Sequence, residues 1–209
     1  MSDILINIAD VRHRSEANGP GLRSVVWVQG CSRYCPGCFN PHTHPHEAVK
    51  LLDPEELGRH LAGIADTVGI TISGGEPFEQ AAACAVLAET VRAAGKTVTV
   101  FSGCPFEQLK ESPAPAIQRF LRSIDLIVAG PYLQELACES KLWRASSNQT
   151  VHFLTENEAD ADTDAATPVM EVRTDGQQLS FTGFPESEDL TWFDRLSAAL
   201  NSVGSPVNP

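Results

Sequence analysis

The order of strand-like and helix-like segments is the feature that most constrains the fold of this chain. Between Val25 and Gly130, short apolar runs typical of buried strands alternate with segments whose apolar residues recur at helical spacing. Such alternation predicts an α/β fold, in which parallel strands are joined by right-handed crossovers. The predicted strands are residues 4–12, 22–30, 68–73, 96–103 and 125–130, and the predicted helices are residues 53–66, with Asp53 as N-cap, 78–95 and the segment around 117–124.

The unusual loops of the chain all follow predicted strands. A cysteine-rich loop follows residues 22–30, and Gly74-Gly75-Glu76-Pro77 follows residues 68–73. Ser102-Gly103 and Gly130-Pro131 close the next two strands. The carboxyl ends of parallel strands meet at one edge of a sheet, where ligands collect. We therefore expect these loops to share one binding edge.

The cysteine-rich loop, "CSRYCPGCFN", brings Cys31, Cys35 and Cys38 within eight residues. Three thiolates at this spacing can hold three irons of a [4Fe-4S] cluster and leave the fourth iron open to a small molecule. The alternative is a zinc site completed by a histidine of "PHTHPH". Structural zinc sites usually pair two knuckles of two ligands each, so the triplet favours the cluster.

Composition excludes several classes of function. The formal net charge of −12 argues against a nucleic-acid binder, because binding to phosphate needs a basic surface. No apolar stretch is long enough to span a bilayer, and "MSDILINIAD" lacks the features of a signal peptide. We therefore expect a cytoplasmic protein with neither nucleic acid nor membrane as partner. In that reducing compartment, clustered cysteines among the six in the chain more often bind metal or take part in chemistry than form disulfides.

Two motifs together resemble the radical S-adenosylmethionine superfamily. They are the C-x-x-x-C-x-x-C spacing after one predicted strand and "GGEP" after the next. More narrowly, "NGPGLRSVVWVQGCSRYCPGCFNPHT", "IDLIVAGPY" and "LWRASSNQTVHFL" resemble segments of anaerobic ribonucleotide reductase activating proteins, and pyruvate formate-lyase activating enzymes are similar at a greater distance. The resemblance covers roughly residues 3–154.

This resemblance implies a small, incomplete (β/α) barrel of the radical S-adenosylmethionine type over residues 1–154. It also implies two cofactors, a [4Fe-4S] cluster and S-adenosyl-L-methionine, which the cluster reduces to release a 5′-deoxyadenosyl radical. An open barrel would admit the glycine loop of a partner, a glycyl-radical enzyme. The electrons would come from a reductant such as flavodoxin or ferredoxin.

The resemblance also implies roles for single residues. Cys31, Cys35 and Cys38 would ligate the cluster and so form the catalytic centre. Glu76 would bind the ammonium group of S-adenosylmethionine. The other expected cofactor-binding residues are Phe39, packed on the cluster or adenine; Asn40, orienting the loop; Gly74 and Gly75, permitting close backbone approach; Ser102, near the ribose or the methionine carboxylate; and Asn148, with Gln149, near the adenine edges.

Some positions depart from the pattern of the related sequences. Asn18 and Ala129 stand where Asp is usual, Cys104 where an aromatic residue is common, and Ala145 where Gly is usual. These departures put the substrate in doubt, and not the cleavage chemistry.

Residues 155–209 lie beyond the resemblance and form a predicted C-terminal appendage. Residues 155–167 are rich in acidic residues and predict a connector. The segment 168–184 predicts a hairpin with Asp175-Gly176 at its turn, and 186–202 predict a last amphipathic helix.

Three functions compete at this point. An activase would place a glycyl radical on a partner such as anaerobic ribonucleotide reductase, which the motifs and the small size favour. The alternative is a radical enzyme acting on a small molecule, such as a nucleoside or a natural-product intermediate, with the appendage as a lid. A non-enzymatic zinc or cluster module is disfavoured by "GGEP" and by the strand–helix alternation.

Overall fold

A seven-stranded mixed sheet forms the centre of the molecule. The computed structural model describes residues 4–138, 143–158, 170–174 and 179–184, together with residues 191, 192, 195 and 198. The strand order is β3-β1-β2-β4-β5-β6-β7, and β2, β4, β5 and β6 run parallel to one another. The bounds are β1 (Ile6–Ser15), β2 (Arg23–Val28), β3 (Lys50–Leu52), β4 (Gly69–Gly74), β5 (Thr97–Ser102), β6 (Leu126–Ala129) and β7 (Thr150–Phe153).

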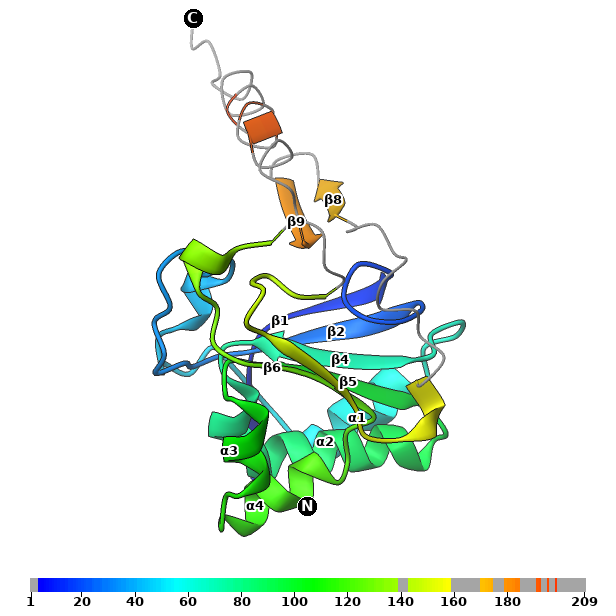
Figure 1. The fold of residues 1–209 in the computed structure, drawn as a ribbon. Coiled ribbons are helices and arrows are strands. Elements are labelled where there is room, and N and C mark those ends of the chain that lie inside the picture. Colours follow the sequence, from blue (N-terminus) through cyan, green and yellow to red (C-terminus); the bar gives the residue numbers. More distant parts are fainter. Residues whose placement is uncertain are drawn as a thin grey trace, which may run out of the picture.

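Four α-helices lie on one face of this sheet (Figure 1). They are α1 (Pro54–Ala62), α2 (Ala81–Ala93), α3 (Phe106–Lys110) and α4 (Pro115–Leu121), and the short 3₁₀ turns are η1 (Pro41–Thr43), η2 (Pro77–Gln80), η3 (Gln134–Leu136) and η4 (Glu156–Glu158). Asp53 caps α1, since its side chain accepts from the amides of Glu55 and Glu56. The apolar face of α2, including Cys84 and Leu87, is fully buried against the strands.

The predicted α/β class and the parallel arrangement of the inner strands are confirmed. The sequence did not predict β3, α3 or β7. All three residues of β3 are exposed, and β7 pairs antiparallel with β6, so neither has the continuous apolar run of a buried strand. The described part of the sheet is open, with β3 and β7 at its edges, and no barrel closure is present there.

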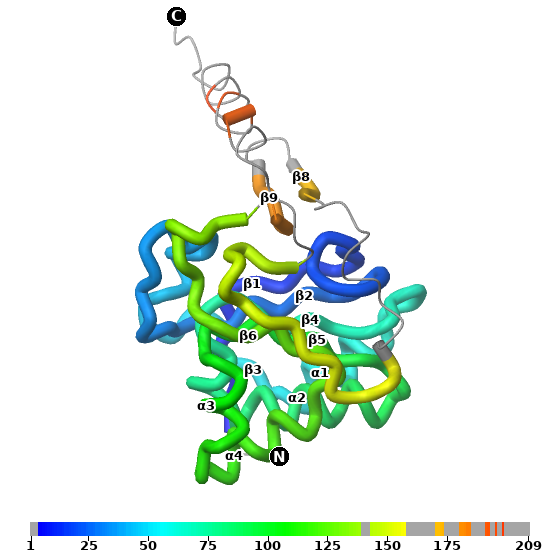
Figure 2. Tube along the Cα trace, in the orientation of Figure 1, coloured from blue at the N-terminus to red at the C-terminus, as the bar shows by residue number. Residues whose placement is uncertain are grey.

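The appendage contains a two-stranded antiparallel sheet, β8 (Met170–Thr174) with β9 (Leu179–Gly183), which agrees with the predicted hairpin strands. It lies on the side of the sheet away from the helices (Figure 2). The predicted turn at Asp175-Gly176 lies outside the described residues, as do most of the acidic connector and most of the predicted last helix; Thr191 and Trp192 are helical. A helix that could span a membrane is not found in the part of the chain that the structure describes.

Candidate functional site

The cysteine loop, residues 31–40, leaves the end of β2 and is held at its base. The amide of Gly30 donates to the carbonyl of Thr43 (2.8 Å), and the amide of Cys31 donates to the carbonyl of His44 (3.0 Å). Gly37 turns the loop at φ 72°, and Tyr34 also has a positive φ, 47°. Cys31, Cys35 and Cys38 thus lie on one loop at the edge where β2 ends, and the amide of Cys38 donates to the carbonyl of Cys35 (3.2 Å) within it.

The thiols of this loop are available as ligands. All six cysteines of the chain are free; Cys31 is buried, whereas Cys35 and Cys38 are partly exposed. Burial raises the pKa of Cys31 and of Cys38, and for Cys31 the carboxylates of Glu76 and Glu79 add to the effect. The ligating thiolate form therefore needs a nearby positive charge, such as a metal centre supplies.

The loop fits an iron–sulfur cluster in its donors. Three soft sulfur ligands without competing disulfides are what such a cluster requires. Within the described part of the chain, no three His, Cys, Asp or Glu side chains are already arranged to hold a metal ion. Two of the three histidines of the zinc alternative have other contacts, since His44 packs on Tyr34 (ring centroids 4.9 Å apart) and His46 bonds Glu79 (2.7 Å). The third, His42, lines the same cavity as Cys38.

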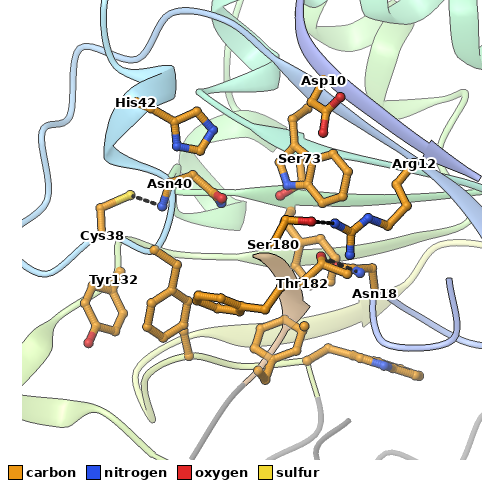
Figure 3. Close-up of a pocket in the computed structure, with 18 of the residues that line it drawn as sticks. Asp10, Arg12, Asn18, Cys38, Asn40, His42, Ser73, Tyr132, Ser180 and Thr182 are labelled. Carbon is orange, nitrogen blue, oxygen red and sulfur yellow. Dashed lines mark hydrogen bonds between the residues drawn. The ribbon is translucent and has the colours of Figure 1, made fainter. Parts of the chain in front are cut away.

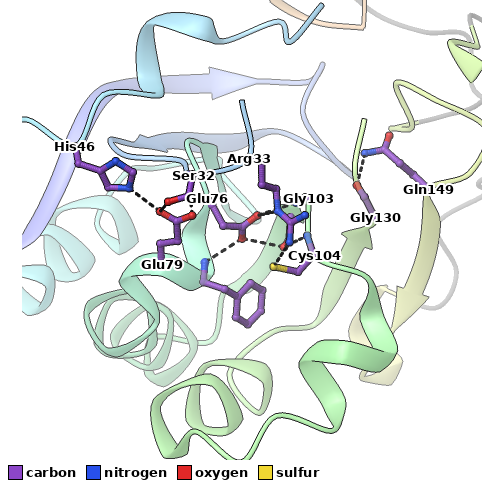
Figure 4. Close-up of polar contacts among 11 residues, drawn as sticks. Ser32, Arg33, His46, Glu76, Glu79, Gly103, Cys104, Gly130 and Gln149 are labelled. Atoms are coloured by element: carbon purple, nitrogen blue, oxygen red, sulfur yellow. Dashed lines mark hydrogen bonds and ion pairs between the residues drawn. The ribbon is translucent and has the colours of Figure 1, made fainter. Parts of the chain in front are cut away.

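Glu76 is the centre of a buried polar network at the ends of β4 and β5 (Figure 4). The residue is 2% exposed. The carboxylate accepts from Ser102 Oγ (2.9 Å), the Gly103 amide (2.9 Å) and the Phe78 amide (3.1 Å). Arg33 Nε lies 3.4 Å from Oε2, and Arg33 Nη2 also donates to Cys104 Sγ (2.8 Å). Burial raises the pKa of Glu76, while these bonds and Arg33 oppose the rise.

The two glycines before Glu76 allow backbone segments to meet. A Cβ on Gly75 would lie 2.2 Å from the carbonyl oxygen of Gly30, and one on Gly74 would lie 2.6 Å from the Val28 nitrogen. The Gly75 amide donates to Val28 O (2.7 Å), and the Glu76 amide donates to Gly30 O (2.8 Å). The expected close backbone approach is therefore made to residues 28–30, which lead into the cysteine loop. The amides of Gly75 and Glu76 are both used in this contact.

Glu79 connects the cysteine loop to η2. Its carboxylate accepts from the amide of Ser32 (2.9 Å) and bonds His46. Partial burial alone would raise the pKa of Glu79, but the hydrogen bonds from His46 and Ser32 outweigh it and lower the pKa. The first residues of the loop are thus positioned from both Glu79 and Glu76.

A cavity of about 470 Å³ opens beside the cysteine loop (Figure 3). Of the expected site residues, Cys38, Phe39 and Asn40 line it. The ring of Phe39 packs against Tyr132, with centroids 5.5 Å apart. Its other lining residues are Asp10, Arg12, Asn18, Trp27, His42, Ser73, Phe101, Tyr132, Trp143, Ala145, Gln149, Ser180, Phe181, Thr182, Gly183 and Phe184.

Apart from Gln149, the remaining expected residues are not among the residues that line the cavity. Glu76 and Ser102 belong to the buried network, and Asn148 Nδ2 donates to the carbonyl of Pro131 (2.7 Å). Its neighbour Gln149 lines the cavity and donates to the carbonyl of Gly130 (3.1 Å). The "SSNQ" loop is therefore at the cavity, with Gln149 contributing directly to its wall.

Sequence reasoning missed Ser73 and Phe101 as cavity residues. Ser73 directly precedes Gly74, and Phe101 directly precedes Ser102, two residues that were expected from the sequence at the binding edge. Since neighbouring strand residues point to opposite faces, this alternation was a usable signal. The contributions of Arg12 and of β9 had no such local signal.

Comparison with known proteins agrees with this geometry. A family model described as "4Fe-4S single cluster domain" matches residues 17–152. An anaerobic ribonucleoside-triphosphate reductase-activating protein of Salmonella typhi is 32% identical over 145 residues, covering 66% of this chain and 92% of the relative. The chain belongs to the family of these activating proteins. Proteins of the same name from Escherichia coli K12 (31% over 145 residues; 66% of this chain, 92% of the relative) and phage T4 (32% over 139 residues; 63% and 84%) are similar as well.

The family match contains the cysteine loop, the Glu76 network and the "SSNQ" loop. It ends at residue 152, before the β8–β9 hairpin. The hairpin therefore lies outside the part of the chain that is matched to the 4Fe-4S family.

Proposed function

We propose that the chain is a radical S-adenosylmethionine enzyme that generates a glycyl radical on an anaerobic ribonucleoside-triphosphate reductase. The observation that carries this proposal is the three-cysteine loop beside a ligand-sized cavity, in a chain that belongs to the family of activating proteins for that reductase. The core would be the incomplete barrel of its superfamily, residues 1–154. A cytoplasmic location and a small electron-transfer protein such as flavodoxin or ferredoxin as reductant complete the proposal.

In this proposal Cys31, Cys35 and Cys38 hold a [4Fe-4S] cluster. When bound, the cluster supplies the electron that cleaves S-adenosylmethionine to the 5′-deoxyadenosyl radical, which abstracts hydrogen from the partner's glycine. Phe39, packed on Tyr132, would cover the side of the loop that faces the cavity. Asn40 holds the exit of the loop, because its carbonyl accepts from the amide and the hydroxyl of Thr43 (3.0 and 2.8 Å).

The strand-end residues have a positioning role in this proposal. Gly74 and Gly75 bring β4 against the base of the cysteine loop, and Ser102 fixes the carboxylate of Glu76. For Glu76 to bind the ammonium of S-adenosylmethionine, the ligand must reach a buried carboxylate that already accepts from three donors. Asn148 and Gln149 would meet the adenine from the β6–β7 side of the same edge, because the start of β7 pairs with the carboxyl end of β6.

A second candidate keeps the same radical chemistry with a small molecule as hydrogen donor. The observation that favours it is the hairpin. The cavity wall includes the β9 residues 180–183 and Phe184, which directly follows β9. A cavity of this volume suits a small substrate better than it suits a protein loop.

The test is activation of the reductase encoded in the same genome. The reconstituted protein, S-adenosylmethionine and dithionite are incubated anaerobically with the inactive reductase, and ribonucleotide reduction is then assayed. We expect activity that depends on all three components and is absent with Cys35→Ala. S-adenosylmethionine cleavage without any activation of the reductase would favour the small-molecule candidate.

A further inference from the structure

The β9 strand forms a wall of the cavity on which the cysteine loop opens. Ser180, Thr182 and Phe184 line the same space as Cys38 and Phe39 (Figure 3). A volume of about 470 Å³ is in the range of pockets that hold one small ligand. With β9 as part of its wall, a cavity of this volume matches one small cosubstrate, and a protein segment beside that cosubstrate would need more room.

Three side-chain contacts hold β9 in place. Asn18 Nδ2 donates to Thr182 Oγ1 (2.9 Å), and both residues are buried. Arg12 Nη2 donates to Ser180 Oγ (2.9 Å). Farther along, the ring of Phe184 packs on Phe101 of β5 with centroids 5.7 Å apart. The hairpin is thus attached to β1, to the loop after β1 and to β5.

The β8 strand adds two contacts to the same region. The amide of Glu16 donates to Glu171 Oε1 (2.7 Å). Arg173 Nη2 donates to the carbonyl of His13 (2.9 Å) and, more weakly, to that of Arg14 (3.3 Å). All these bonds join the hairpin to residues 12–18, so they can break and form together.

The attachment is incomplete in a way that weakens it. Arg12 is 9% exposed, and its Nη1 has no hydrogen-bond partner. Glu171 Oε2 is likewise buried without a partner, and Asp10 and Arg173 are the other charged groups that act on Arg12. Buried charged groups that keep one atom without a hydrogen-bond partner destabilise the state that contains them, so the docked hairpin gives up part of the stability that its other bonds provide.

We propose that the β8–β9 hairpin is a movable wall that decides whether a protein segment reaches the cysteine loop. Closed, it leaves a cavity for one small ligand; open, it admits the glycine-bearing segment of the partner. This inference rests on the proposed function, because the partner is the occupant for which the wall must open. The hairpin, which lies beyond residues 17–152 matched by the family model, would then select the hydrogen donor.

The docked state can be measured in the cluster-free full-length protein by hydrogen exchange at the Glu16 amide, whose acceptor is Glu171. Arg12→Gln removes the bond to Ser180, and Thr182→Val removes the bond to Asn18. Each change should speed exchange at Glu16 by about five- to tenfold, the effect of one lost hydrogen bond. Arg14→Gln is the matched control, because Arg14 bonds Asp66 with its exposed side chain and should leave the rate unchanged. Exchange at the unprotected rate in the wild type would overturn the proposal.

The second arm measures the affinity of the same proteins for the inactive reductase. If the wall must open, Arg12→Gln and Thr182→Val should bind the reductase several-fold more tightly than the wild type and Arg14→Gln, since less of the free energy of binding goes to opening. Equal or weaker binding by the two variants would overturn the movable wall alone. Failure of every form to bind the reductase, with Glu16 exchange still responding, would overturn the proposed function and with it the occupant of the open cavity.

Discussion

The cysteine loop and the strand-end network around Glu76 lie next to each other but differ in how far the protein alone completes them. Glu76 is buried, and its carboxylate has three hydrogen-bond donors and a guanidinium beside it. The cysteine loop is bonded at its base, whereas Cys35 and Cys38 stay partly exposed as free thiols. The difference indicates that the network belongs to the folded apo-protein and that the loop is completed by what it binds.

The largest expected effect is the loss of the cluster when any one of Cys31, Cys35 or Cys38 is replaced by alanine. Three sulfur ligands are the minimum for an open-iron cluster, so anaerobic reconstitution should give a brown protein with about four irons only in the wild type. Cys84→Ala is the control, because Cys84 is buried in α2 and should leave iron uptake intact.

Iron binding alone does not separate the two regions, so the stability of the cluster-free protein is measured too. Cys35→Ala should leave the free energy of unfolding within about 0.5 kcal/mol of the wild type, as surface changes usually do. Stoichiometric zinc without iron uptake would contradict the cluster, and a strongly destabilised Cys35→Ala apo-protein would contradict the comparison.

Glu76→Gln should weaken binding of S-adenosylmethionine while the cluster is retained. Loss of a charge-assisted bond to the ammonium is worth about 1.5–3 kcal/mol, and isothermal titration of the reconstituted protein measures it. Glu79→Gln is the matched control, since Glu79 bonds Ser32 and His46 instead. Unchanged affinity would show that Glu76 acts on the fold alone.

The same Glu76→Gln change should also destabilise the cluster-free protein. The new amide would turn a donor toward the donors of Ser102, Gly103 or Phe78, which leaves buried groups unsatisfied at a cost of about 1–3 kcal/mol. Urea denaturation of both apo-proteins measures the difference. Equal midpoints would mean that the network is not a structural unit of the apo-protein.

The smallest effect is expected at Glu79, which links the two regions. Because hydrogen bonding lowers its pKa, ionised Glu79 stabilises the fold above its ordinary pKa, and this stability is lost as the pH falls through the lowered value. Glu79→Gln should therefore be less stable than the wild type by about 0.5–1.5 kcal/mol at pH 7 and converge with it only once the pH has fallen below the lowered pKa of Glu79. A difference that persists undiminished in acid would exclude this role.

The sequence predicted local features of this fold well and long-range ones poorly. The Asp53 cap, the four parallel strands and the hairpin strands each depend on a few neighbouring residues, and the structure confirms them. The burial of Glu76 depends on the Ser102-Gly103 turn. Ser102, which donates to the carboxylate, is 26 residues from Glu76 in the sequence. Nothing near Glu76 in the chain predicts that turn's position.

The wall of the cavity was the hardest part to predict. Asn18 bonds Thr182 across 164 residues, and Arg12 reaches Ser180 across 168. The departure from Asp to Asn at position 18 marked the right place, and its partner could not be read from local pattern. A neutral amide there can donate to the threonine hydroxyl, which a carboxylate cannot do.

The most direct test of the central claim is an electron paramagnetic resonance spectrum of the reductase after anaerobic incubation with the reconstituted chain, S-adenosylmethionine and dithionite. The account predicts a stable organic radical doublet from the glycine α-hydrogen, which collapses to a singlet when the reductase contains glycine deuterated at the α-carbon. Release of 5′-deoxyadenosine without any radical on the reductase would contradict it.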